Sequence, residues 1–269
     1  MFGVVPKSLW EKGMKADEHN RISMVSRIVL LRRPDNTAIL INSGIGEPRN
    51  KKEEKIFAIQ DQDLAAQLEK RGISASEVTH ILQTHLHFDH AGGLSKLCPL
   101  ELKTDSNPPG EQALEPSFPN AVCFVSERQW KWACSPNMKD RGSYRRNDFQ
   151  PLMDAGLLKT VDTSHGRTEI LESVFVEELR GHTPGMWFIR INDGETRLAI
   201  GTDLFPTRFH LKPQWNMAFD NEPLVTVGEK QALLSDLFCE KRLLILEHDP
   251  DVEAVRLIDK SGSFEAVSL

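Results

Sequence analysis

Three histidines and one aspartate lie within six consecutive residues of this chain, in the run His85-Leu86-His87-Phe88-Asp89-His90. The run follows a β-prone apolar stretch at residues 78–83 and precedes Ala-Gly-Gly-Leu at residues 91–94, where the glycines allow close backbone approach and the start of a short helix. Histidine nitrogen and aspartate oxygen both suit a borderline divalent ion such as zinc, and the alternating spacing lets these side chains converge from one tight loop. The sequence therefore predicts a metal site on a strand-to-helix loop.

Three further candidate ligands lie downstream. His182 lies in Gly-His-Thr-Pro-Gly, Asp203 ends Gly-Thr-Asp, and His248 immediately precedes Asp249. Taken alone, each histidine is equally consistent with a buried or capping role, and Asp203 with a turn residue. Their joint occurrence favours the metal-site interpretation. The remaining histidines at positions 19, 80 and 165 are predicted to be structural or at the surface.

Composition limits the partners and the compartment. The chain has 269 residues, 39% of them hydrophobic and 27% charged, which is ordinary for one large globular domain. A net charge of -6 with no long basic stripe argues against a nucleic-acid partner. No apolar run reaches the length of a membrane span or of a secretory signal, and the four cysteines are scattered without a CxxC pair. These features predict a cytoplasmic protein without a membrane or nucleic-acid partner.

The pattern of elements predicts an α/β fold. An early hairpin is expected at residues 22–33 and 37–41, with a turn at 34–36, and helices at 61–71, 127–133 and 226–239. Further strands are expected at 121–126, 157–161, 174–179, 186–191, 197–200 and 242–246. Five prolines between residues 98 and 119 predict a loop, and we expect an inserted loop and helical lid at about 98–156 within a single domain, 1–269. Two groups of strands, each accompanied by helices, indicate two sheet-plus-helix halves.

The seven candidate ligands, in this order and spacing, resemble those of the metallo-β-lactamase superfamily, and the resemblance extends over about residues 24–249. It implies an αββα sandwich of two mixed sheets flanked by helices, with the site at one edge between the sheets. It also implies two divalent ions, of which zinc is the default, although manganese, iron or cobalt suits the same donors. By this resemblance the first ion is held by His85, His87 and His182, the second by Asp89, His90 and His248, and Asp203 bridges both.

The stretches at residues 85–93 and 181–185 resemble most closely the lactonase-like group, which includes the quorum-quenching N-acyl-homoserine lactonases and methyl parathion hydrolase. This implies a hydrolase whose metal-bound hydroxide, formed because the ions lower the pKa of water to about 7, attacks a small lactone or related ester. Asp89 is also a candidate proton acceptor. Tyr144, the only tyrosine, and His210 are candidate catalytic residues, although Tyr144 is equally consistent with a packed ring and a solvated hydroxyl.

Two other functions remain open: a phosphotriesterase or phosphodiesterase, since the same hydroxide attacks phosphorus, and a non-catalytic metal-binding protein. The N-terminal arm with Phe2 and Trp10 is a candidate homodimer surface. Two positions depart from the superfamily pattern. Asn42 begins Asn-Ser-Gly where the superfamily usually carries Asp-x-Gly, which predicts an altered metal affinity or metal choice because ligands depend on such partners for orientation. Thr202, a hydroxyl residue, precedes Asp203.

Overall fold

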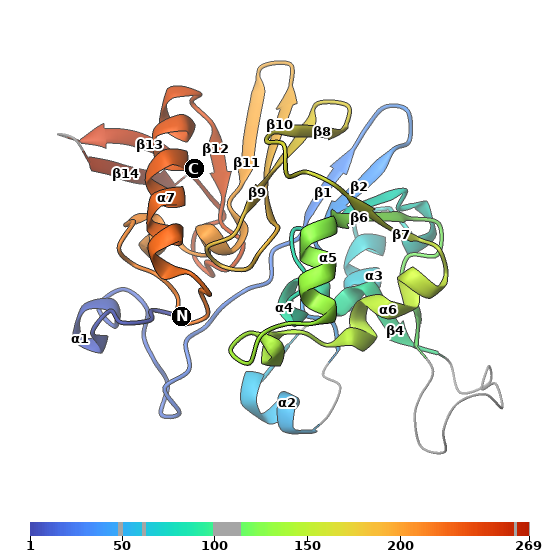
Figure 1. The fold of residues 1–269 in the computed structure, drawn as a ribbon, viewed down its shortest axis with the longest axis horizontal. Coiled ribbons are helices and arrows are strands. Elements are labelled where there is room, and N and C mark those ends of the chain that lie inside the picture. Colours follow the sequence, from blue (N-terminus) through green and yellow to red (C-terminus); the bar gives the residue numbers. More distant parts are fainter. Residues whose placement is uncertain (48–50, 61–62, 99–113, 261–262, 269) are drawn as a thin grey trace. The chain divides into compact units, whose positions relative to one another are not determined.

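The computed structural model describes residues 1–47, 51–60, 63–98, 114–260 and 263–268. This part of the chain folds into two compact units. Unit 1 comprises Met1–Arg27 with Asp162–Leu269, and unit 2 comprises Ile28–Val161 (Figure 1). Each unit contains its own mixed β-sheet, so the predicted α/β class with two mixed sheets is confirmed.

The sheet of unit 2 has five strands in the order β1-β2-β3-β6-β7. The first pair is an antiparallel hairpin, as predicted, and the other neighbours are parallel. The turn of the hairpin places Asn36 in the left-handed region at φ 68°, which asparagine tolerates. The strand bounds are Val29–Arg32 for β1, Ala38–Ile41 for β2, His80–Leu82 for β3, Val122–Ser126 for β6 and Leu158–Val161 for β7.

Short helices connect and cover this sheet. Side chains cap two of them: Asp63 accepts the N–H of Ala66 at the start of α3, and Ser126 accepts the N–H groups of Arg128 and Gln129 at the start of α5. β4 pairs with β5 in a separate two-stranded sheet. The bounds are Lys51–Phe57 for α2, Leu64–Glu69 for α3, Ala75–Glu77 for η1, Phe88–Ala91 for α4, Gly92–Leu94 for η2, Ser95–Leu97 for β4, Leu114–Pro116 for β5, Glu127–Cys134 for α5, Arg141–Ser143 for η4 and Arg146–Asp154 for α6.

The structure describes part of the segment predicted as a lid. Of residues 98–156, the segment 99–113 lies outside the described residues, as do residues 61 and 62 of the predicted helix at 61–71. The remainder supplies β5, β6, α5 and α6, and β6 lies between β3 and β7 in the sheet. Trp130 and Phe149, on α5 and α6, meet edge to face with ring centroids 5.6 Å apart. The single-domain organisation stays a prediction.

The sheet of unit 1 has seven strands in the order β14-β13-β12-β11-β10-β9-β8, antiparallel except for the parallel pair β11 and β12. The prediction missed β8, β13 and β14. The bounds are Thr168–Leu171 for β8, Val174–Leu179 for β9, Met186–Asp193 for β10, Thr196–Ile200 for β11, Leu243–Ile245 for β12, Ala254–Lys260 for β13 and Ser263–Ser268 for β14.

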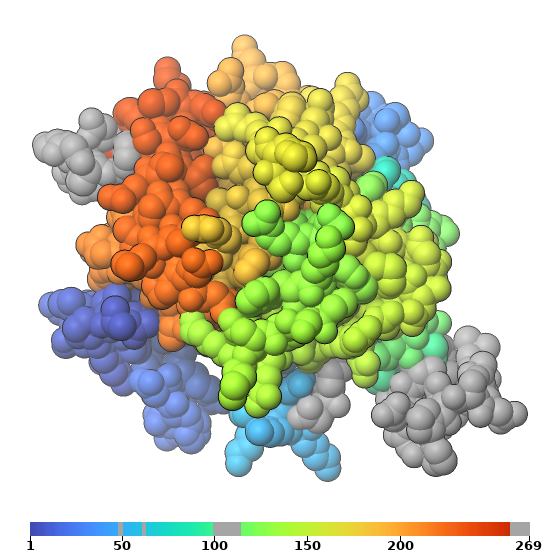
Figure 2. All heavy atoms as spheres, in the orientation of Figure 1, coloured from blue at the N-terminus to red at the C-terminus, as the bar shows by residue number. Residues whose placement is uncertain are grey.

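The long helix α7 (Pro223–Cys239) covers one face of this sheet. Leu233, Leu234 and Leu237 are buried against strand residues in one apolar core, whereas Leu224 is exposed, and Figure 2 shows the outer side of α7, in orange, at the surface of the unit. Shorter helical segments are Lys7–Trp10 for α1, Thr202–Leu204 for η5 and Arg208–Leu211 for η6.

Within the described residues, none of the helices combines the length and the apolar character needed to cross a bilayer.

The loop after β2 packs tightly against the start of η2. Ser43 donates its backbone N–H and its hydroxyl to the carbonyl of His90, at 2.9 and 3.0 Å. A Cβ atom at Gly92 would lie 1.9 Å from the carbonyl oxygen of Ile45, and one at Gly93 would lie 2.2 Å from that of Ser43. Only glycine therefore fits where these two segments meet, and their contact fixes the position of His90.

We predict that Gly92→Ala lowers the free energy of unfolding by about 1–3 kcal/mol, the usual cost of overpacking, because backbone must move to admit the methyl group. Gly142→Ala is the matched control, since a Cβ there meets nothing within 4 Å. Urea unfolding of both variants and the wild type measures the difference. Equal midpoints for the two variants would contradict the argument.

Candidate metal centre

Unit 2 brings the rings of its three candidate histidine ligands together. His85 and His87 lie on the loop after β3, and Asp89 and His90 lie on α4. The ring centroid of His85 is 4.6 Å from that of His87 and 4.0 Å from that of His90. The three histidines are 0 to 4% exposed, whereas the Asp89 side chain is 29% exposed. The loop thus gathers nitrogen and oxygen donors in a largely buried cluster.

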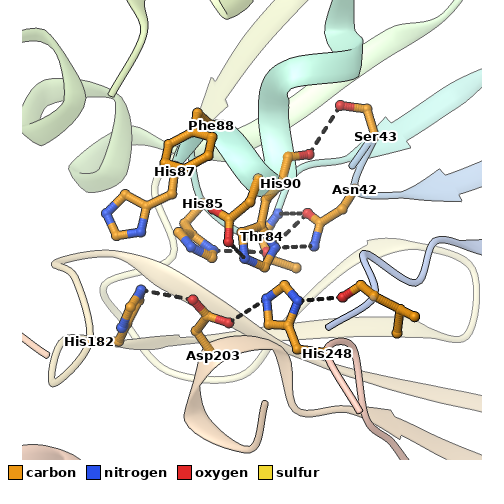
Figure 3. A network of polar contacts seen from close by, with 12 residues as sticks. Asn42, Ser43, Thr84, His85, His87, Phe88, His90, His182, Asp203 and His248 are labelled. Carbon is orange, nitrogen blue, oxygen red and sulfur yellow. Dashed lines mark hydrogen bonds and ion pairs between the residues drawn. The ribbon is translucent and has the colours of Figure 1, made fainter. Parts of the chain in front are cut away.

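Thr84 and Asn42 form a hydrogen-bond network behind this cluster (Figure 3). The carbonyl oxygen Oδ1 of Asn42 accepts the backbone N–H of Thr84 at 2.9 Å and its hydroxyl at 3.0 Å. The Thr84 hydroxyl also lies 3.1 Å from Nδ1 of His85, and Nδ2 of Asn42 lies 3.1 Å from Nδ1 of His90. Asn42 adopts a left-handed backbone with φ 62°. The residue that departs from the superfamily pattern therefore contacts one of the candidate ligands directly.

A buried carboxylate, that of Asp140, holds the ring of His87. Its Nε2 lies 3.0 Å from Oδ1 of Asp140, and the other oxygen of this buried carboxylate accepts the indole N–H of Trp132 at 2.8 Å. Since Nε2 is bound to Asp140, a metal ion would bind His87 through Nδ1. A carboxylate in this position orients the ring and raises its basicity as a ligand.

Tyr144 lies beside the same histidine. Its ring meets that of His87 edge to face at 4.7 Å between centroids, and its hydroxyl donates to Oε1 of Gln129 at 3.0 Å. Tyr144 is thus next to the candidate ligands within unit 2, although its catalytic role stays a prediction.

Unit 1 contributes a line of three donors (Figure 3). His182 follows β9, Asp203 lies in η5 after β11, and His248 follows β12. Asp203 lies between the two rings, with Oδ2 3.1 Å from Nε2 of His182 and Oδ1 2.9 Å from Nε2 of His248. All three side chains are at most 7% exposed. A carboxylate with one oxygen toward each of two imidazoles has the arrangement required of a bridging ligand.

Both candidate histidine ligands of unit 1 have a partner at Nδ1, the nitrogen that does not face Asp203. Nδ1 of His182 lies 3.0 Å from Oδ1 of Asp220, and Nδ1 of His248 donates to the carbonyl of Val25 at 2.7 Å. A metal ion would therefore bind each of these rings through Nε2. Glu229 of α7 accepts the backbone N–H groups of Arg180 and Gly181 and so fixes the loop that carries His182.

Thr202, the residue before Asp203, has an unusual backbone conformation. Its backbone is left-handed, at φ 41°, which is strained for a β-branched residue. Such strain costs about 1–3 kcal/mol and persists only where the surrounding structure enforces it. Thr202 is fully buried and begins η5. The strained turn at Thr202 therefore sets the direction of the backbone at the next residue, Asp203.

His210 lies on η6 of unit 1, close enough to Asp203 for that carboxylate to act on its pKa. It is fully buried, its ring stacks on Phe2 at 4.9 Å, and its Nδ1 lies 2.8 Å from the hydroxyl of Thr207. Burial, aided by the charge of Lys230, lowers the pKa of His210 to about 3, so the ring is neutral. These contacts favour a structural role, and the catalytic role of His210 stays a prediction. Phe2 also stacks on Trp10 at 5.1 Å, and the homodimer prediction for this arm is not tested by these contacts.

The chemistry of the donors fits divalent ions. Each unit offers imidazole nitrogens from buried histidines and a carboxylate oxygen, the donor types that zinc, manganese, iron and cobalt share. Sequence reasoning missed Asp140 and Asp220, the two carboxylates that contact candidate ligands. Neither belongs to a motif, and only the fold brings them to the histidines.

Comparisons with known proteins give a family match over part of the chain and a structural match over all of it. The sequence model of the metallo-beta-lactamase superfamily matches residues 24–103. The crystal structure of a probable metal-dependent hydrolase from Staphylococcus aureus resembles this structure with a TM-score of 0.84 and 24% identity, over 100% of this chain and 91% of that one. Residues 24–103 therefore match the metallo-β-lactamase superfamily, as the motifs predicted, and the chain shares the fold of the Staphylococcus aureus protein.

Particular relatives point to the lactonase-like group. The N-acyl homoserine lactonase AttM of Azorhizobium caulinodans is 29% identical over 201 residues, which is 71% of this chain and 66% of that protein. The structure of AidC, a dizinc quorum-quenching lactonase with a bound product, has a TM-score of 0.70 and 23% identity, over 91% of this chain and 80% of that one. The chain thus spans just under two thirds of the AttM lactonase, and the similarity to lactonases that the motifs predicted is confirmed.

The protonation of His182 gives a testable consequence. Burial lowers the pKa of this ring, but the carboxylates of Asp203 and Asp220 act in the opposite direction and raise it to about 10. In the metal-free protein the ring therefore keeps its proton at pH 8, and an ion that binds Nε2 must displace that proton.

We predict that divalent-ion binding at pH 8 releases about one proton from His182, and that the release declines as the pH rises through about 10. Asp220→Asn removes one of the carboxylates that raise the pKa and should shift this decline to lower pH, whereas Asp193→Asn, at an exposed strand end, should not. Calorimetric titration of metal in buffers of different ionisation enthalpy measures the released protons. A release by Asp220→Asn that follows the wild-type pH profile would count against this assignment.

Proposed function

We propose that the donors of the two units act together as one dinuclear metal centre, and that the protein hydrolyses a small lactone or related ester. In this proposal His85, His87 and His182 hold one ion, Asp89, His90 and His248 hold the other, and Asp203 bridges the two. The observation that carries the proposal is the contact of Asp203 with both His182 and His248, one through each carboxylate oxygen. The donor types favour zinc first and do not disfavour manganese, iron or cobalt.

The two ions, when bound, would supply Lewis acidity and lower the pKa of water toward about 7, which makes a hydroxide available at neutral pH. The protein's own residues would then position the reaction. Hydrogen bonds at the second nitrogen hold the buried histidines in position. Asp203 fixes the spacing between the two halves of the donor set.

Asp89 and Tyr144 are the residues with access to a substrate. The Asp89 carboxylate is the most exposed of the unit 2 donors at 29%, so it can accept the proton of the attacking water. The Tyr144 ring lies beside that of His87 in the same unit, and its hydroxyl can donate to a substrate carbonyl after leaving Gln129. Lactones are favoured as substrates because lactonases recur among the relatives, AttM and AidC among them.

A substrate panel on metal-quantified protein tests the proposal. We expect about two ions per chain and turnover of N-acyl-homoserine lactones or simple lactones above that of aryl esters and phosphotriesters. Asp203→Asn should lose metal and at least about 100-fold in kcat/KM, because a bridging carboxylate and its charge are removed together. Asp193→Asn is the control with the same change of charge at an exposed position.

Each other outcome of this panel has a meaning. Preference for phosphotriesters or phosphodiesters would replace the lactonase proposal with the phosphohydrolase alternative. Two bound ions with no turnover of any substrate would favour a non-catalytic metal-binding protein. Full turnover by protein stripped of metal with a chelator would sink the dinuclear mechanism.

Asp89→Asn separates the two roles proposed for Asp89. The amide keeps an oxygen donor for the metal but cannot accept a proton, so kcat should fall by about 100-fold or more while most of the metal remains bound. Single-turnover kinetics and metal analysis on the same preparation measure both quantities. Parallel loss of metal and activity would assign Asp89 to metal binding alone.

A further inference from the structure

His90 differs from the other histidines of the proposed centre in the hydrogen-bond partner of its outer nitrogen, the ring nitrogen that would not bind the ion. The corresponding nitrogens of His87, His182 and His248 each face a hydrogen-bond acceptor. These acceptors are the carboxylates of Asp140 and Asp220 and the carbonyl of Val25, respectively. The Thr84 hydroxyl donates its hydrogen bond to Asn42, so its oxygen acts as an acceptor for the N–H at Nδ1 of His85. The outer nitrogen of His90 instead faces the amide nitrogen Nδ2 of Asn42, which is a donor.

The orientation of that amide is fixed by the chain itself. The two ends of an asparagine side chain can be exchanged on paper, but Oδ1 of Asn42 lies 2.9 Å from the backbone N–H of Thr84. A backbone N–H only donates, so the carbonyl end of the side chain must face Thr84. The NH₂ end consequently faces His90 (Figure 3).

A donor at Nδ1 decides the tautomer of His90. Nδ1 must present its lone pair to Asn42, and the proton of the neutral ring then resides on Nε2. Nε2 lies 3.8 Å from Oδ2 of Asp89, a carboxylate oxygen that attracts a proton there. A metal ion, however, requires the lone pair at Nε2, because Nδ1 is already bound to Asn42.

We propose that Asn42 is a positioning residue that holds His90 in the tautomer opposite to the one metal binding needs, and so makes the ion assigned to His90 the weaker of the pair. The inference rests on the dinuclear centre proposed above. To bind the ion, the ring must place its proton at Nδ1 against the amide N–H, or Asn42 must give up its bonds to Thr84. Either change removes a hydrogen bond within a fully buried network.

The effect should be visible as two unequal metal affinities. Loss of a partner that orients a histidine ligand typically costs about 10- to 100-fold in affinity. At limiting zinc the wild-type protein should fill one position first and the position at His90 last. Activity that needs both ions would then rise with free zinc concentration over the range in which the second ion binds.

Asn42→Asp supplies the test. A carboxylate of nearly the same shape accepts both the Thr84 N–H and a proton on Nδ1 of His90, so the Nε2 lone pair becomes available. Competition of the protein with a chromogenic chelator for zinc should show the weaker dissociation constant tightening by about 10- to 100-fold. Asn36→Asp is the matched control, because Asn36 is exposed and also has a left-handed backbone. Folded Asn42→Asp with two unchanged constants would overturn the inference.

The tautomer itself is measured without any metal. In metal-free, ¹⁵N-labelled wild-type protein, long-range ¹H–¹⁵N correlation spectra should show His90 protonated at Nε2, with the signal assigned by its loss in His90→Gln. Asn42→Asp should move the proton to Nδ1. A wild-type His90 protonated at Nδ1 would overturn the role of Asn42 even if two ions bind. A protein that binds no zinc would instead overturn the proposed function, and the spectrum would still decide the tautomer.

Discussion

An imidazole ligates a metal through one nitrogen, and the hydrogen bond at the other nitrogen decides which one it is. The candidate centre of this chain depends on that constraint at every histidine. Because Asp140 contacts Nε2 of His87, a metal ion would bind that ring through Nδ1, and because Asp220 and Val25 contact Nδ1 of His182 and His248, an ion would bind those rings through Nε2. The geometry of the donors is therefore set by residues that would never touch a metal ion.

The fold uses the same arrangement in each unit to bring residues of the candidate site together. In unit 2 the parallel strands β2 and β3 end beside each other, so the loop with Asn42 meets the loop with Thr84 and His85. In unit 1 the parallel strands β11 and β12 end together and deliver Asp203 and His248. Ligand sites commonly lie at the carboxyl ends of parallel strands, because neighbouring loops emerge there at one edge of the sheet.

The sequence predicted the elements whose signals are local. The His85–His90 run, the hairpin at β1 and β2 and the apolar start of β10 each carry their pattern within a few residues. Helix α7 begins at Pro223, ahead of the expected residue 226, because proline fits the first turn of a helix. Strands β8 and β13 were missed because charged residues interrupt them, Glu169 in one and Arg256 in the other.

Partners that come from distant segments gave no such signal. Asp140 is separated from His87 by 53 positions and Asp220 from His182 by 38, and neither spacing is fixed by a local element. The departure at Asn42 was visible in the sequence, but its direction of effect was not, because that depends on which end of the amide faces His90. The backbone N–H of Thr84 fixes that orientation, because it must face the carbonyl end of the Asn42 amide.

Burial divides the donors into two kinds. The histidines are at most 4% exposed, and their polar atoms must be satisfied by fixed partners, since a buried group without one costs about 1–3 kcal/mol. Such residues can retain an ion but cannot easily move with a reacting substrate. Asp89, at 29% exposure, has no comparable burial constraint and can exchange a proton with solvent. The same loop thereby provides both rigid donors and one group with the freedom that proton transfer requires, and this argues for Asp89 rather than the fully buried His210 as the proton acceptor.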